Sequence, residues 1–526
     1  MRKLSRLAVG VMVAALVSAA GVEVAAGAGS SKQRERAERL VRAGEFAEAE
    51  RMFRELLAKD ARDGQSRLGL SLALLKQRKN MDAYDQAARV VAVDPTSARA
   101  HALLGTALLN SGDFRLSVEE FRTALSFKDD DAMAIAGLAM VDFYENRLGA
   151  SLAGLRRAAF LDGGEPDYLF NLGQVAARHE RYAEAATAYE NFLRVAPKTD
   201  AERRARIRGL IDFLRYLGTQ SDLLSVGGPS RVTVPFEIVN NRPIIKVRVN
   251  NWKEPLRFVV DTGAGMCVIS TTAAERVGLK PVARGGMARA VGGGGRFEIV
   301  YAFLQTLNIG EAKVERVPLY IRQFYNEQEP VDGYIGLAVV GKYLTTLDYG
   351  AGTMTLLRDD ARQTAAAPGP SAVEIPIRTT SSGFWSGEVR VEGVERPVNF
   401  IIDTGASISV VSEALSQRFE LGRFERGGRI RVYGAAGLAE NIQTLLLPQI
   451  VFGTHPRRNV YAAVLDMEPI NETAGFEQTG IVGGNVLRFY RVTFDFERAV
   501  VRLDPLAGGP ADKDLKSAPP VVTSQG

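Results

Sequence analysis

The chain contains nearly the same segment twice, and this duplication constrains the fold more than any other feature. The sequence FVVDTGAGMCVIS runs from Phe258 to Ser270, and FIIDTGASISVVS runs from Phe400 to Ser412. Each copy places an aspartate in a turn directly after a run of strand-forming residues. Such an aspartate is costly unless it is satisfied, and two carboxylates brought together must share a proton. The sequence therefore predicts a paired carboxylate site.

The duplication extends well beyond the turn. Asp403 follows Asp261 by 142 residues, and farther along the offset becomes 147, at which Thr346 matches Thr493. Further first-copy residues with an identical partner at one of these offsets are Val247, Val249, Pro255, Gly333, Gly336, Tyr343, Asp348 and Leu356. Matches that persist over this length indicate an internal repeat of a unit of about domain size.

Length and composition indicate a globular protein of several domains. A chain of 526 residues suggests about three domains. The 66 basic and 61 acidic residues are spread along the chain without a basic block, so we expect no nucleic-acid partner. The three histidines show no metal-ligand spacing, and the single cysteine, Cys267, has no base nearby in the sequence. We expect neither a metal nor a cofactor.

The N-terminus resembles a secretory signal. Basic residues at positions 2, 3 and 6 precede a short apolar stretch from Leu7 to Ala20, and small residues follow. This order predicts a signal peptide over residues 1–28 and export to the bacterial periplasm or the extracellular space. An uncleaved membrane anchor is the alternative, although Glu23 interrupts the apolar run. A membrane contact is expected only in that case.

Residues 31–218 predict helices that repeat every 34 residues. Two sets of residues recur at this step: Phe46, Asn80, Phe114, Leu148 and Tyr182, and Phe53, Ala87, Phe121, Leu155 and Tyr189. The period and positions resemble the tetratricopeptide repeat, with about five units. Such helix pairs stack because no pair buries its apolar face alone, and the usual partner of the stack is a protein or peptide. A polar-faced capping helix is expected over Thr199 to Leu217.

Composition shifts to strand and turn signals after Gly218. The expected boundaries are a linker at 219–230, a first β unit at 231–358, a second linker at 359–372, a second β unit at 373–505 and a disordered tail at 506–526. Asp348 and Asp495 match between the two β units and are expected to be turn or strand-end carboxylates rather than part of the site.

The β region resembles the aspartic proteases, both the two-lobed pepsin-like enzymes and the dimeric retropepsin-like enzymes. Three features carry the resemblance in each half: the Asp-Thr-Gly-Ala turn, a Gly-rich hairpin downstream, and an apolar-Gly motif, which is Tyr334-Ile335-Gly336 or Ile481-Val482-Gly483. The resemblance covers about residues 231–505. It implies a multidomain α + β chain, in which an α-solenoid of TPR-like helix pairs precedes a bilobal, all-β acid protease fold.

The resemblance implies roles for the turn residues. Asp261 and Asp403 would be catalytic and would face each other between the lobes. The supporting residues of the two turns would be Thr262, Gly263, Thr404 and Gly405. The glycines permit a tight turn, and the threonines are expected to hydrogen-bond across the seam.

Flap residues are expected in the Gly-rich hairpins, which would close over substrate. The candidates for the flap and for substrate binding are Gly292, Gly293, Gly294, Tyr433 and Gly434. Tyr433 resembles the flap tyrosine of pepsin-like enzymes, but in those it belongs to the first lobe. The sequence leaves open which hairpin covers the substrate, because a flexible hairpin tip is an equal interpretation of the glycines.

The sequence thus predicts an aspartic endopeptidase, a hydrolase that cleaves peptide bonds with water activated between two carboxylates. Its partners would be a protein or peptide substrate and a protein recruited by the helical repeats. Two alternatives stay open. One is a non-catalytic interaction protein, and the other is an enzyme whose lobes pair with those of a second chain.

Overall fold

The computed structural model describes residues 30–289, 296–325, 330–426, 428–434 and 437–506. The predicted signal peptide at 1–28 and the tail beyond Leu506 lie outside the described residues. So do Gly292, Gly293 and Gly294. Compactness divides the chain into two units, residues 1–138 with 196–200, and residues 139–195 with 201–526.

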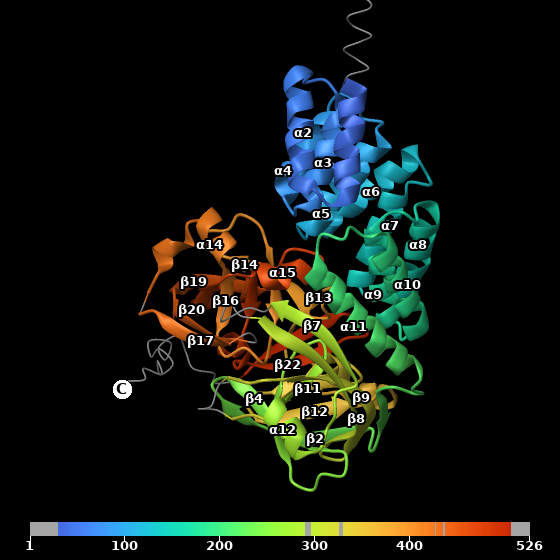
Figure 1. The fold of residues 1–526 in the computed structure, drawn as a ribbon. Coiled ribbons are helices and arrows are strands. Elements are labelled where there is room, and N and C mark those ends of the chain that lie inside the picture. The colour runs from blue at the N-terminus through green and yellow to red at the C-terminus, as the bar shows by residue number, and fades with distance from the viewer. Residues whose placement is uncertain (1–29, 290–295, 326–329, 427, 435–436, 507–526) are drawn as a thin grey trace, which may run out of the picture. The chain divides into compact units, whose positions relative to one another are not determined.

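The N-terminal region is entirely helical, as predicted (Figure 1). A first helix covers residues 30–43. The following helices are α2 (Phe46–Lys59), α3 (Gly64–Lys76), α4 (Asn80–Val91), α5 (Ala98–Asn110), α6 (Phe114–Phe127), α7 (Ala132–Tyr144), α8 (Leu148–Leu161), α9 (Pro166–Arg178), α10 (Tyr182–Val195) and α11 (Ala201–Gly218).

The 34-residue period marks the second helix of each repeat. The residues of the first recurring set are the first residues of α2, α4, α6, α8 and α10. The second set forms the core, since Phe53, Phe121 and Tyr189 are at most 2% exposed. Glycines make room for these rings: a Cβ at Gly105 would lie 2.6 Å from Phe121, and one at Gly173 would lie 2.9 Å from Tyr189. The repeat therefore follows from how each helix pair packs.

The last helix, α11, does more than cap the array. Its exposed face is polar, as expected, with Glu202, Arg208 and Asp212 exposed. Its other face packs against the β region, where Phe213 and Leu217 belong to a buried cluster with Tyr301 and Phe303. Phe213 stacks on Tyr301 with ring centroids 4.2 Å apart. The helix is therefore part of the packing of the first lobe.

The first lobe contains strands β1 to β12 and two short helices. Its strands are β1 (Ser225–Gly227), β2 (Arg231–Pro235), β3 (Glu237–Val239), β4 (Arg242–Val249), β5 (Leu256–Val260), β6 (Cys267–Ser270), β7 (Ala283–Arg289), β8 (Arg296–Ile309), β9 (Ala312–Arg322), β10 (Gly333–Ile335), β11 (Leu344–Asp348) and β12 (Thr353–Leu357); its helices are α12 (Thr271–Arg276) and α13 (Leu337–Val340). Nine strands form one sheet around the first turn. Strand β1 lies inside the predicted linker at 219–230 and pairs with β9.

The second lobe repeats this arrangement. Its strands are β13 (Val373–Thr379), β14 (Trp385–Val391), β15 (Val398–Ile402), β16 (Ser409–Ser412), β17 (Ile430–Gly434), β18 (Gly437–Ile442), β19 (Thr444–Phe452), β20 (His455–Leu465), β21 (Gly480–Val482), β22 (Tyr490–Asp495) and β23 (Val500–Pro505); its helices are α14 (Glu413–Arg418), α15 (Glu468–Ala474) and α16 (Gly484–Leu487). The 3-10 helices η1 (Asp359–Thr364) and η2 (Leu421–Phe424) lie before β13 and after α14.

Strands from both lobes share one sheet. Its order is β13-β23-β22-β11-β12-β2 across the junction, so β11 of the first lobe pairs with β22 of the second. Thr346 and Thr493, which match in the duplication, are partners in this register, and their hydroxyl oxygens lie 3.0 Å apart. The two copies therefore meet along equivalent strands within one chain. Over the part of the chain that the structure describes, no helix is both long and apolar enough to cross a bilayer.

Candidate active site

Each aspartate of the duplicated turn lies at the end of a buried strand. The backbone N–H of Asp261 donates to Ile335 (3.0 Å), and that of Asp403 donates to Val482 (3.0 Å). Ile335 and Val482 belong to the apolar-Gly motifs, whose strands β10 and β21 run parallel to β5 and β15. The motif therefore fixes the position at which each turn begins.

The two turns are joined by the threonines, as the resemblance implied. The N–H of Thr262 donates to the hydroxyl of Thr404 (3.1 Å), and the N–H of Thr404 donates to that of Thr262 (3.1 Å). Each hydroxyl also donates across the seam, Thr262 to Ile402 (2.7 Å) and Thr404 to Val260 (2.6 Å). Because both side chains are buried, these four bonds hold the turns in one relative position.

The glycines are required by the opposite carboxyl group rather than by backbone angle. A Cβ at Gly263 would lie 2.3 Å from the carboxyl of Asp403, and a Cβ at Gly405 would lie 2.5 Å from that of Asp261. Each carboxyl group therefore occupies the space that a side chain on the opposite turn would need. The two carboxyl groups hydrogen-bond to each other.

The two carboxyl groups are not equivalent. Oδ1 of Asp403 accepts from the N–H groups of Gly405 (2.7 Å) and Ala406 (3.1 Å), whereas Oδ1 of Asp261 accepts from Gly263 alone (2.8 Å). Burial raises the pKa of both, and the neighbouring charge of Asp403 raises the pKa of Asp261 further. Donors to a carboxylate stabilise its charged form. The unequal donors therefore favour the proton on Asp261 and the negative charge on Asp403.

Each lobe also braces the turn of the other. Between β3 and β4, the side-chain amide of Asn241 donates to the carbonyl of Ser407 in the second turn (3.0 Å). At the equivalent place between β13 and β14, the carbonyl of Ser382 lies 2.8 Å from the position of a Cβ on Gly265. The site is thus built by backbone turns from both halves.

Known families match the two regions separately. Residues 245–339 and 387–486 match the aspartyl protease family. Three tetratricopeptide repeat families match residues 40–106, 98–131 and 137–198. The chain contains an aspartyl protease domain and tetratricopeptide repeats. No curated protein matches the chain significantly.

Solved structures match each region at low identity. The aspartic proteinase of Irpex lacteus is 14% identical with a TM-score of 0.37, and the match covers 53% of this chain and 99% of that one. A thermophilic TPR protein of Thermus thermophilus is 19% identical with a TM-score of 0.30, covering 35% and 98%. MamA from Desulfovibrio magneticus is 22% identical with a TM-score of 0.23, covering 32% and 92%.

The hairpins of the protease domain differ between its lobes. In the first lobe, β7 and β8 extend the lobe's own sheet, and α11 packs along them (Figure 1). The guanidinium of Arg206 donates to the carbonyl of Met287 (3.0 Å), and Glu202 forms an ion pair with Arg296. In the second lobe, β17 and β18 form a separate two-stranded sheet.

The predicted second-lobe flap residues lie on that separate sheet. Tyr433 pairs with Leu438 and Gly434 with Gly437 in the register of β17 and β18. Tyr433 is 42% exposed. Nothing in its surroundings assigns it to substrate, so its flap role stays a prediction.

The lone cysteine is a packing residue of the first lobe. Cys267 is buried, its sulfur accepts the N–H of Gly336 (3.3 Å), and burial raises its pKa to about 12. Ser409 takes the equivalent place in the second lobe and accepts the N–H of Gly483 (3.2 Å).

The matched pair Asp348 and Asp495 also has structural partners. Asp348 accepts the N–H of Gly350 (3.0 Å), and Asp495 forms an ion pair with Arg362.

Arg242 and Arg322 were not singled out in the sequence, and Tyr334 was noted only as part of the apolar-Gly motif. Tyr334 lies on β10, and its hydroxyl hydrogen-bonds to buried Arg242. Burial and the charge of Asp403 raise the pKa of Asp261, and the positive charge of Arg322, at the end of β9, opposes this rise weakly. Single arginines at strand ends carry no sequence signal, so only the sheet register reveals this group.

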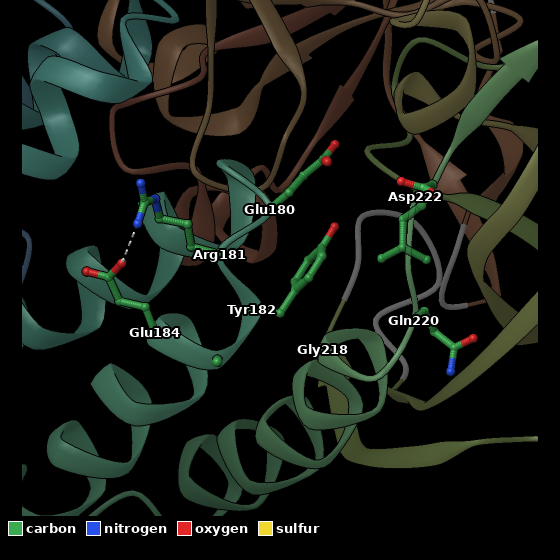
Figure 2. Close-up of a pocket in the computed structure, with 9 residues that line it drawn as sticks. Glu180, Arg181, Tyr182, Glu184, Gly218, Gln220 and Asp222 are labelled. Carbon is green, nitrogen blue, oxygen red and sulfur yellow. Dashed lines mark ion pairs between the residues drawn. The ribbon is translucent and has the colours of Figure 1, made fainter.

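A polar pocket of about 520 Å³ lies away from the carboxylates (Figure 2). Its lining comes from the start of α10 and the segment after α11, and Arg181 pairs with Glu184 at 3.8 Å beside it. It contains neither Asp261 nor Asp403. Within the described residues, no three His, Cys, Asp or Glu side chains gather as metal ligands.

Proposed function

We propose that the chain is an aspartic endopeptidase that hydrolyses peptide bonds with water activated between Asp261 and Asp403. The observation that carries the proposal is the pair of hydrogen-bonded carboxyl groups with unequal backbone donors. Two carboxyl groups this close share one proton, and the unequal backbone donors decide which of them keeps it. A pure scaffold would not need two buried acids at all, since buried acids destabilise the fold.

The unequal donors assign the two roles. Ionised Asp403 takes a proton from a water held between the carboxyl groups as that water attacks the peptide carbonyl carbon. Protonated Asp261 donates its proton to the carbonyl oxygen, which stabilises the tetrahedral intermediate. The proton gained by Asp403 then passes to the leaving nitrogen, the C–N bond breaks, and the intermediate returns a proton to Asp261. No covalent intermediate with the protein forms.

The test is cleavage of a diverse peptide library by Asp261→Asn and Asp403→Asn across acidic to neutral pH. Each variant should lose about 10²- to 10⁴-fold or more of the wild-type rate, because each removes one proton-transfer group. Asp359→Asn serves as the control, because its side chain is 80% exposed and lies on η1. Full activity in either catalytic variant would exclude a shared dyad.

A single chain is proposed to supply both carboxylates. The pairing of β11 with β22 and the four threonine hydrogen bonds join the lobes of one chain. An active monomer on sizing chromatography is expected. Activity found only in a dimer fraction would favour lobes that pair between chains.

We further propose that the helical repeats bring a protein partner or substrate to the protease domain. Tetratricopeptide repeats support this because such arrays usually present an extended surface to protein segments.

The basic and then apolar N-terminal segment supports the further proposal that the protein is exported to the periplasm. Fractionation of cells that express the tagged chain should recover it outside the cytoplasm, and recovery in the cytoplasm alone would contradict export.

A further inference from the structure

One face of the first-lobe sheet gathers the polar residues beside Asp261. In the register of β10, Tyr334 pairs with Val259 and Val268, and in the register of β6, Ser270 pairs with Arg322. Residues two apart in a strand point to the same face, so Val259 and Asp261 share a face, and so do Val268 and Ser270. Tyr334 and Arg322 therefore lie on the same face as the catalytic carboxyl of Asp261.

The guanidinium of Arg322 is enclosed by aromatic rings. It lies 5.3 Å from the ring centroid of Phe297 on β8 and 6.0 Å from that of Phe324. The ring of Phe324 in turn packs edge-on against Tyr334, with centroids 5.1 Å apart. This places the cation between the hairpin strand β8 and the strand that supports Asp261.

No carboxylate pairs with Arg322 among the residues that the structure describes. Its Nε is buried without a hydrogen-bond partner, and burial lowers its pKa. A guanidinium with open donors in such surroundings is costly unless an anion reaches it, and its planar fork suits a carboxylate.

The duplicate shows that the fold does not require a cation here. In the second lobe, Ser412 pairs with Leu465, and Ser409 to Ser412 is the copy of Cys267 to Ser270. Leu465 is buried with Ile401 and Ile481 in an apolar cluster. The same position thus holds a leucine in one half and an arginine in the other, so the arginine has a purpose beyond packing.

We propose that Arg322 binds an acidic side chain of the peptide substrate, on the first-lobe side of the scissile bond. This rests on the proposed peptidase function and names its substrate class. A glutamate or aspartate placed beneath β8 meets the open donors of Arg322, and its charge replaces the lost hydration of the guanidinium. The apolar cluster around Leu465 offers no such partner, so the preference belongs to one side of the site.

The test compares matched peptides that carry Glu or Gln at each position around the cleaved bond. At one position, kcat/KM should favour Glu by roughly 10- to 100-fold, the range expected for a charge-assisted hydrogen bond. Arg322→Met, which retains an apolar stem between the rings, should abolish this ratio, and Arg322→Lys should retain part of it. Arg390→Met, an exposed residue of β14, is the matched control and should leave the ratio unchanged.

Two further outcomes separate this proposal from its alternatives. If Arg322 only lowers the pKa of the catalytic pair, Arg322→Met shifts the alkaline limb of the pH–activity profile to higher pH for both peptides. The Glu-to-Gln ratio of kcat/KM would then stay unchanged, which overturns the proposal. Absence of a Glu preference in the unmodified protein overturns it as well, whatever the variants do.

Binding separates this proposal from the peptidase function. Asp261→Asn should bind the Glu peptide more tightly than the Gln peptide, by calorimetry, and the additional Arg322→Met change should remove the difference. Glu-selective binding without any cleavage by the wild type would keep the acidic subsite and reject the peptidase. Cleavage without Glu selectivity would keep the peptidase function and reject the acidic subsite.

Discussion

The two lobes share an Asp-Thr-Gly-Ala turn, yet the residues around this turn differ between them. In the first lobe, the hairpin β7–β8 continues the main sheet and is covered by α11, and the positive charge of Arg322 opposes the rise in the pKa of Asp261 that burial and Asp403 cause. In the second lobe, β17–β18 stands as a separate ribbon, and Leu465 replaces the arginine. The duplication therefore preserves the contacts that hold the two aspartates together and varies the residues around them. The two matching turns form one site, and the residues around the turns make its two sides different.

The largest effect is expected where α11 holds only one of the hairpins. Phe213→Ala removes the ring that stacks on Tyr301, and a large-to-small change in a buried contact costs about 3–5 kcal/mol. Amide hydrogen exchange should accelerate in the described parts of β7 and β8 and stay unchanged in β17 and β18. Phe160→Ala, on α8 and 88% exposed, is the control. Equal acceleration in both hairpins would show that α11 does not distinguish the lobes.

The catalytic turns should respond alike to an added methyl group. Gly263→Ala and Gly405→Ala each place a Cβ where the opposite carboxyl group lies. A displacement of about 1 Å of a reacting group costs on the order of 10²-fold in rate, so kcat/KM should fall by about that factor in both variants. The comparison is made on one peptide at one pH. If only one variant loses activity, the two turns do not contribute equally.

The smallest expected effect is a difference in thermal stability between the variants in which each aspartate is replaced by asparagine. Because burial raises the pKa of Asp261 above its unfolded value, the protonated form is favoured in the folded state, and stability is lost as pH rises from the unfolded pKa through the folded pKa. Asp261→Asn removes this loss. It should therefore raise Tm relative to wild type at neutral pH and have little effect at low pH.

Asp403→Asn is the matched comparison for that measurement. The N–H donors of Gly405 and Ala406 oppose the rise in the pKa of Asp403, so its replacement should stabilise less. Each unit of pKa difference corresponds to about 1.4 kcal/mol. A larger gain in Tm for Asp403→Asn would reverse the assignment of the shared proton.

Local sequence signals predicted the elements of this fold closely. The 34-residue period marks the first residues of α2, α4, α6, α8 and α10, because each helix pair packs with the same spacing. The duplicated turns and apolar-Gly motifs predicted the pairing of Asp261 with Asp403, since identical local patterns build identical local structure. The hydrogen bonds of Thr262 and Thr404 follow from that symmetry.

Contacts between distant segments required the tertiary structure. The packing of α11 on the β7–β8 hairpin joins two elements that have no shared pattern, so a polar-faced cap was the natural expectation for that helix. The unequal donors of Asp261 and Asp403 depend on hydrogen-bond geometry that near-identical sequences do not reveal.

The amino-acid sequence by itself determined the repeated units and the carboxyl pair, because periodicity and duplicated motifs are written in neighbouring residues. The tertiary structure decided which groups surround that pair. Arg322 and Leu465 occupy equivalent strand ends, and only the sheet register, with Ser270 and Ser412 as partners, brings them to the same place in the two lobes. Strand register is set by many backbone hydrogen bonds and side-chain contacts between strands, so it cannot be predicted from any single segment.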